Sequence, residues 1–246
     1  MKGDAIRRVC GGAILLVVVN LAPAVSAIDA GILGRAWQNH PAVAVRFTSE
    51  SRDVYEYDNR EAGEADLQGR FVAISVPVGQ AVALEAEVGQ EAWDPHSEHG
   101  LDYGWGTAWG VGAAAVLPLP AGEWGRAAFP SLFLGWAVRY RRAEPDKDYR
   151  RDLQQYFSPE VDEWQISCEL VGRLRTASLG LGIRYSQVDL VYSHEGAYGR
   201  REGGLEEDHP WGLFLDAELR AGRAFISGEF RFLDANGGTV ALGCRF

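Results

Sequence analysis

The sequence has 246 residues, a length that fits one large domain or two small ones. It carries 24 basic and 34 acidic residues, and this acidic balance argues against nucleic acid as a partner. Of its three cysteines, Cys10 lies near the N-terminus, and Cys168 and Cys244 are far apart, which is a poor basis for a disulfide framework.

The first 27 residues have the pattern of a secretory signal peptide. Lys2, Arg7 and Arg8 give a basic start, residues 13–19 are apolar, and small residues stand at 25–27, where a signal peptidase cleaves. The apolar stretch is shorter than the ~20 residues that a membrane-spanning helix needs. We therefore predict cleavage after this segment.

Two-residue alternation dominates the rest of the chain. Leu213, Leu215 and Ala217 fall on one face, for example, and Asp216 and Glu218 on the other. Because successive side chains of a strand point to opposite faces, each such run predicts a strand with one apolar and one mixed face. We count ten runs, at about 42–57, 67–79, 80–92, 107–119, 129–142, 163–174, 177–192, 209–220, 223–233 and 238–246.

The connections between these runs alternate in length. Those at 142–163 and 193–208 are long and charged, whereas those at 78–80, 175–176 and 221–222 are tight. Long loops on one rim and short turns on the other are typical of outer-membrane barrels, and an even strand number brings both termini to the short-turn rim. Two connections depart from the rule, an intermediate one at 118–126 and a short one at 233–238.

Alternation also occurs in soluble barrels and sandwiches, whose apolar face turns inward. Two features favour the inverted arrangement. The mixed face is rich in small residues such as Gly110, Gly112, Gly180 and Gly182, which suit a narrow lumen. Aromatic residues near the ends of the apolar face predict girdles at a membrane interface, with core packing as the alternative; they are Trp109, Trp136, Tyr140, Trp164, Tyr185 and Trp211.

The last strand is a third feature. Its alternating set Val240, Leu242, Cys244 and Phe246 ends on an aromatic residue and resembles the insertion signal of bacterial outer-membrane proteins. With the strand number and the loop asymmetry, the chain resembles the small bacterial outer-membrane β-barrel superfamily. We therefore predict an all-β fold, a closed antiparallel transmembrane β-barrel of about ten strands over 42–246, after a periplasmic segment at 28–41.

The resemblance also implies a location and partners. It implies an integral protein of the cell outer membrane with both termini in the periplasm. The expected partners are outer-membrane lipid, lipopolysaccharide and, through the last strand, the barrel-assembly machinery.

The mixed face places charges of both signs in the predicted lumen. A closed barrel of ~8–10 strands is only just wide enough for side chains or a narrow passage, and unpaired buried charges are costly, so we expect ion pairs. Two interpretations stay open: a structural lattice that plugs the barrel, which we favour, and a narrow pore for small solutes. The predicted lumen-lining residues are Arg46, Glu85, Glu87, Arg139, Arg141, Glu169, Arg173, Arg184, Asp216, Glu218, Arg220, Glu229 and Arg231.

A rim hydrolase is a weaker alternative. Omptin-type proteases are ten-stranded barrels with acidic residues and an Asp/His pair at the outer rim, and Asp94, Asp208 and His209 lie in roughly corresponding connections. The family's spacings, Asp-Xaa-Asp in the second long connection and Asp-Xaa-His in the fourth, do not occur there.

Other reactive groups are equally incomplete. Ser193, His194 and Glu195 have the residue types of a lipid A deacylase site, but adjacent strand residues point to opposite faces. His96 and His99 have no second pair of metal ligands nearby in the sequence. We therefore expect no enzyme activity, no catalytic residue, no cofactor and no metal.

Overall fold

The computed structural model describes residues 40–56, 62–79, 81–95, 103–120, 129, 131–150, 155–196 and 199–246. The predicted signal peptide at 1–27 and most of the predicted periplasmic segment at 28–41 lie outside these residues, as do His96 and His99. Within the described part, no helix is long and apolar enough to cross a membrane.

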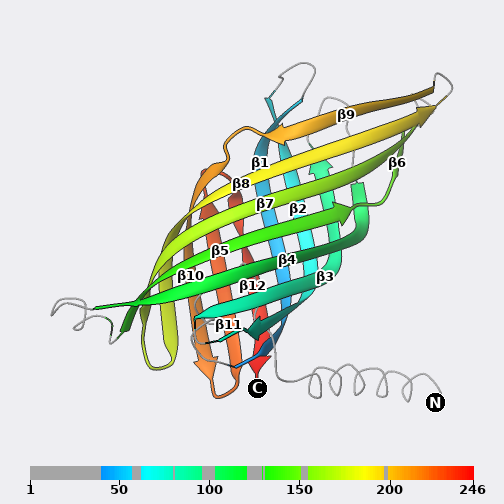
Figure 1. The fold of residues 1–246 in the computed structure, drawn as a ribbon. Helices are drawn as coiled ribbons and strands as arrows, with labels where there is room; N and C mark the ends of the chain where they lie inside the picture. The colour runs from blue at the N-terminus through cyan, green and yellow to red at the C-terminus, as the bar shows by residue number, and fades with distance from the viewer. Residues whose placement is uncertain are drawn as a thin grey trace, which may run out of the picture.

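Twelve antiparallel strands make up the described chain (Figure 1). They are β1 (Ala42–Glu56), β2 (Ala62–Pro77), β3 (Val82–Pro95), β4 (Tyr103–Leu119), β5 (Ser131–Glu144), β6 (Asp148–Arg150), β7 (Gln155–Arg173), β8 (Ala177–Gly196), β9 (Gly199–Glu207), β10 (Trp211–Ala221), β11 (Ala224–Phe232) and β12 (Asn236–Arg245).

Ten of these strands form a closed ring, in the order β1, β2, β3, β4, β5, β7, β8, β10, β11, β12. The ring closes where β12 pairs with β1, from Ala42 opposite Arg245 to Ser51 opposite Asn236. Closure gives each ring strand a partner on both sides and removes open sheet edges. The predicted ten-stranded, closed antiparallel barrel is confirmed.

Two short strands, β6 and β9, lie in connections that the sequence predicted as loops. β6 pairs with the start of β7, and β9 pairs with the end of β8 and with the end of β1. β7 and β8 have 19 and 20 residues, more than predicted. The two longest predicted loops are therefore partly folded sheet, and Figure 1 shows β8 and β9 projecting together at the end away from the C-terminus.

Tight turns close the opposite end of the barrel. Gly79 has φ of 89° and Gly222 has φ of 62°. Both values lie in the left-handed region, where a side chain is disfavoured, so glycine allows the chain to reverse there. The turns predicted at 78–80 and 221–222 are confirmed in position.

The outward face of the ring is an apolar belt. Leu181 is 57% exposed and Phe230 is 63% exposed, and valine, leucine and isoleucine side chains surround them. Many of the buried side chains of the same strand segments are charged or polar, alongside alanine and phenylalanine. This distribution is the reverse of a soluble barrel and is that of a barrel spanning a membrane.

An aromatic girdle borders this belt on the side of the long connections. The ring centroids of Trp109 and Tyr140 are 5.5 Å apart, those of Tyr140 and Trp164 are 4.8 Å apart, and those of Tyr185 and Trp211 are 5.2 Å apart. These are favourable aromatic contacts at the position where membrane barrels place their interfacial rings. Trp136 is also exposed, but it lies on β5 two outward positions deeper in the belt than Tyr140.

Beyond the girdle the same strands carry their apolar side chains on the inside. Leu67, Trp93, Val161 and Leu190 form part of a buried hydrophobic cluster at this end of the barrel. Most of the outward neighbours of these residues are polar, for example Asp162 beside Val161 and Asp189 beside Leu190. We call this part the outer extension; it comprises residues 52–56, 62–70, 90–95, 103–108, 141–144, 155–163, 187–196 and 199–207.

Candidate functional site in the barrel lumen

A lattice of charged side chains lies in the lumen, from the inner part of the outer extension towards the short-turn end. Of the thirteen residues predicted to line it, eleven are buried, and Arg173 and Arg220 are half-buried. Strand alternation explains this placement, because the charged residues share a parity that turns them away from the apolar belt. Ion pairs among them satisfy charges that would otherwise be costly to bury.

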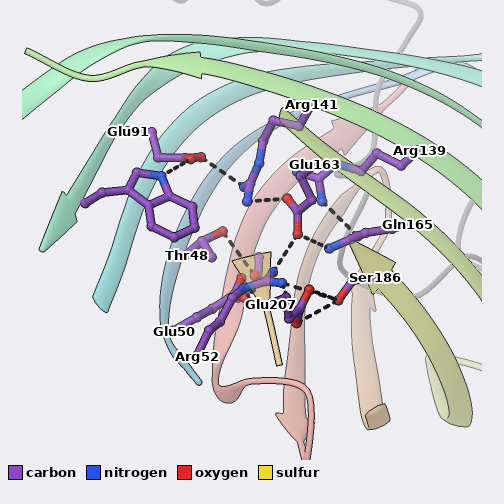
Figure 2. Close-up of polar contacts among 12 residues, drawn as sticks. Thr48, Glu50, Arg52, Glu91, Arg139, Arg141, Glu163, Gln165, Ser186 and Glu207 are labelled. Atoms are coloured by element: carbon purple, nitrogen blue, oxygen red, sulfur yellow. Dashed lines mark hydrogen bonds and ion pairs between the residues drawn. The ribbon is translucent and has the colours of Figure 1, made fainter. Parts of the chain in front are cut away.

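One ion pair crosses the whole lumen (Figure 2). Arg52 Nη2 lies 2.5 Å from Glu163 Oε1, and the two side chains are 0% and 1% exposed. Arg52 belongs to β1 and Glu163 to β7, which is the sixth strand of the ten-stranded ring counted from β1. Side chains from opposite walls of the ring therefore meet at this level of the lumen.

Arg52 contacts three carboxylates at once. Besides Glu163 it pairs with Glu50 at 2.9 Å and with Glu207 at 3.1 Å. Ser186 adds a hydroxyl that donates to both oxygens of Glu207, at 3.0 and 2.9 Å. Glu50 and Glu163 each pair with a second arginine, Arg231 and Arg141 respectively, whereas no second arginine is paired with Glu207 within the described chain.

Glu207 differs from the other carboxylates in its origin. It is the last residue of β9, which is not one of the ten ring strands. Burial raises the pKa of Glu207 to about 7, while the positive charge of Arg52 acts in the opposite direction. Glu163 and Asp234 raise it further, because they add negative charge nearby.

The lattice continues from Glu163 towards β3. Arg141 pairs with Glu163 and lies 3.1 Å from Glu91 Oε2. The indole Nε1 of Trp93, a fully buried residue, donates to Glu91 at 2.6 Å. The polar lattice is thus joined directly to the hydrophobic cluster of the outer extension.

On the other side the lattice continues through β11 to β8. Glu50 pairs with Arg231, which lies 2.6 Å from Glu229, and Glu229 lies 3.2 Å from Arg184. Arg184 also pairs with Asp234 at 2.6 Å. From Glu91 to Asp234, negative and positive groups alternate without a break through six ring strands and the turn between β11 and β12.

The turn that carries Asp234 has an unusual backbone. Leu233 adopts φ of 80°, a left-handed conformation that is uncommon outside glycine. Leu233 is exposed, whereas Asp234 is buried over Gly212. The turn thus brings a carboxylate into the lumen.

A second set of pairs fills the middle and lower lumen. Glu87 pairs with Arg46 at 2.5 Å and with Arg139 at 2.7 Å, which links β1, β3 and β5. Glu218 pairs with Arg245 at 2.5 Å and with Arg220 at 3.3 Å. Charges of both signs are therefore paired along the length of the lumen.

Large side chains of neighbouring strands lie against the lumen glycines. A Cβ on Gly110 would meet Glu87, and one on Gly180 would meet Asp216 and Glu169. Phe214 and Phe225 occupy the space beside Gly182 and Gly243 in the same way. The small residues thus accommodate large side chains of neighbouring strands.

Several members of the lattice were missed by the sequence analysis. Five of them have the inward parity of predicted strands, and the alternation that identified Arg46 or Glu169 also applies to them: Glu50, Arg52, Glu91, Glu163 and Arg245. Glu207 and Asp234 lie in segments predicted as connections, where alternation gives no signal.

The candidate catalytic residues do not come together. Asp94 is on the outward side of β3, and the backbone N–H of Asp208 donates to Asp53 of β1. β1 and β2 therefore separate Asp94 from His209, whose ring pairs with Asp208 at 3.1 Å. Within the described part of the chain, no three His, Cys, Asp or Glu residues are grouped to hold a metal ion.

The structure is similar to those of bacterial outer-membrane β-barrels. The translocator domain of autotransporter NalP from Neisseria meningitidis matches at 12% identity and a TM-score of 0.39, covering 100% of this chain and 98% of that one. Outer membrane protease OmpT from Escherichia coli matches at 10% identity and a TM-score of 0.44, covering 82% and 92%. The β domain of the Bordetella autotransporter BrkA matches at 11% identity and a TM-score of 0.38, covering 83% and 98%. No family model and no curated protein matches the sequence.

Proposed function

We propose that this protein is an outer-membrane β-barrel with a closed lumen and a structural or surface-interaction role. The observation that carries the proposal is the ion pair between Arg52 and Glu163, which joins opposite walls of the ring. Large side chains pack beside the lumen glycines, for example Glu87 beside Gly110. This packing supports the proposal, because a conducting lumen needs the space that these side chains occupy. The outer extension is then the part of the molecule available to partners at the cell surface.

The orientation follows from the two rims. Long strands and connections lie at one end and tight turns at the other, so we place the outer extension outside the cell and both termini in the periplasm. The belt faces membrane lipid. Val240 and Leu242 are exposed on β12, in line with recognition of this strand by the barrel-assembly machinery.

Enzyme activity is not part of the proposal. Within the described residues, the arginines and carboxylates of the lumen are engaged with one another, and Asp94 and His209 lie apart. A general base must lie within hydrogen-bonding reach of the proton that it removes. An envelope or adhesive role requires no such group.

Single-channel recording tests the closed lumen. We expect no current steps from the refolded wild-type protein in a planar lipid bilayer, with folding verified by a mobility shift between unboiled and boiled samples. We expect steps from the double variant Arg52→Ala, Glu163→Ala, because it removes the contact between the two walls. The matched control is Arg142→Ala, Asp162→Ala, which removes a partly exposed pair on the outward surface of β5 and β7.

Discrete, salt-proportional steps from the wild type would contradict the proposal and favour the narrow pore. Silence from the folded wild type together with steps from the lumen variant would locate the closure at Arg52. If protein refolded into lipid showed the same mobility in unboiled and boiled samples, the membrane barrel itself would be contradicted.

A further inference from the structure

The outward surface of the outer extension differs between its two sides. On β5, β7 and β8 it carries carboxylates, among them Glu144, Glu160, Asp162 and Asp189. Arg142 lies among them, 3.5 Å from Glu144 and 3.3 Å from Asp162, and also pairs with Glu160. The positive charge of Arg142 is therefore neutralised by its neighbours.

On β2 to β4 the corresponding surface carries an arginine in different surroundings. The exposed Arg70 donates from Nε at 3.0 Å and from Nη2 at 2.5 Å to Gln90 Oε1. Its guanidinium lies over the Trp105 ring, 4.3 Å from the centroid. Among the described residues, no carboxylate accepts a hydrogen bond from Arg70 or forms an ion pair with it.

The position of Arg70 relative to the belt is also distinctive. The next outward residue of β2 is Val72, 45% exposed, and Val88 lies beside it on β3, 64% exposed. Arg70 is thus the first polar outward residue of β2 beyond the apolar belt. In a membrane barrel this is the depth of lipid headgroups.

We propose that Arg70, Gln90 and Trp105 bind a phosphate group of an outer-leaflet lipid, such as the phosphates of lipopolysaccharide. Gln90 holds two of the five guanidinium N–H donors, which orients the planar group and leaves the others for phosphate oxygens. Trp105 supports the guanidinium from one face through a cation–π contact. The site rests on the proposed membrane position, because its depth brings it level with headgroups.

Binding of diphosphoryl lipid A to the folded protein in detergent micelles, followed by native mass spectrometry, tests the site. We expect Arg70→Gln to weaken binding about tenfold, since one charge-assisted hydrogen bond of about 1.4 kcal/mol corresponds to that factor. Trp105→Leu should weaken it less, because it removes only the support. The matched control is Arg142→Gln, which removes an outward arginine that is already paired with three carboxylates and should leave binding within about twofold.

Two further arms identify the source of the phosphate. Lipid A without phosphate groups should bind the wild type about as weakly as diphosphoryl lipid A binds Arg70→Gln. Inorganic phosphate alone should show no binding at the same concentration; equal affinity would overturn the lipid assignment.

The outcomes separate the site from the membrane proposal. Equal loss in Arg70→Gln and Arg142→Gln, or no loss in either, overturns the site while the barrel still shows its mobility shift. Failure of the wild type to show that shift overturns the membrane position and, with it, the site.

Discussion

The belt and the outer extension are built from the same strands but distribute their side chains in opposite ways. On β8, Leu181 and Ile183 face outward, whereas Leu190 and Tyr192, beyond the girdle residue Tyr185, are buried. The strand itself continues without interruption in its pairing to β7. The two regions of β8 therefore differ in whether the outward or the inward residues of the alternation are apolar.

The comparison shows that the surroundings of the barrel decide which face is apolar. Next to lipid, an apolar side chain is stable outside and the polar groups pair inside. Next to water, burial of apolar surface favours the opposite choice, at roughly 25 cal/mol per Å². The strand register is the same in both regions, so the sequence must shift the phase of its alternation where the strand leaves the membrane.

The largest expected effect is at Arg52, where the two regions meet. Arg52→Met leaves Glu50, Glu163 and Glu207 buried around the lost guanidinium. Breaking a buried ion pair by removing one partner costs about 3–5 kcal/mol. We expect the free energy of unfolding in urea, measured by tryptophan fluorescence of protein inserted in phospholipid vesicles, to fall by that amount.

Arg142→Gln is the control for this prediction. Its side chain is 30% exposed, and its three ion pairs lie on the outward surface. Such pairs contribute about 0–1 kcal/mol, so a small change is expected. Equal effects of the two variants would mean that the lumen lattice contributes no more than surface charge.

The next prediction tests the position of the boundary. Ile183 and Gln187 are both outward on β8, on either side of Tyr185. Ile183→Arg places a charge in the belt and should cost about 2–4 kcal/mol in vesicles. Gln187→Arg should change stability by less than about 0.5 kcal/mol, because its side chain reaches water. Similar costs at the two positions would refute the change of environment at the girdle.

The sequence predicted the ring well because the membrane imposes one rule on ten segments. Each ring strand overlaps a predicted run, and the alternation placed residues such as Arg139 and Arg231 in the interior. The outer extension was harder to predict. Leu190 and Tyr192 follow Ile183 in the opposite parity, which weakens a pattern sought over the whole strand.

The lattice was predictable as a composition but not as a set of contacts. Parity alone can place Arg52 and Glu163 in the lumen, but their contact depends on the ring order and register that bring β1 opposite β7. Asp234 reaches the lumen through a turn with Leu233 in the left-handed region, a conformation that its sequence does not signal.

The last prediction concerns Glu207, through which the outer extension reaches into the lattice. Its pKa is raised to about 7 in the folded protein, so between about pH 4.5 and 7 the folded state holds a proton that the unfolded state releases. The free energy of unfolding should therefore fall as the pH rises through this window and level off above it. Glu207→Gln carries no titrating group at this position and should remove that part of the pH dependence. The difference in urea midpoint between wild type and variant therefore isolates the contribution of Glu207.

The contradicting outcome is a pH dependence that Glu207→Gln leaves unchanged, or a difference of opposite sign. Glu207 would then be ionised throughout this pH range and fully paired with Arg52. β9 would in that case be held to the lattice as firmly as the ring strands are.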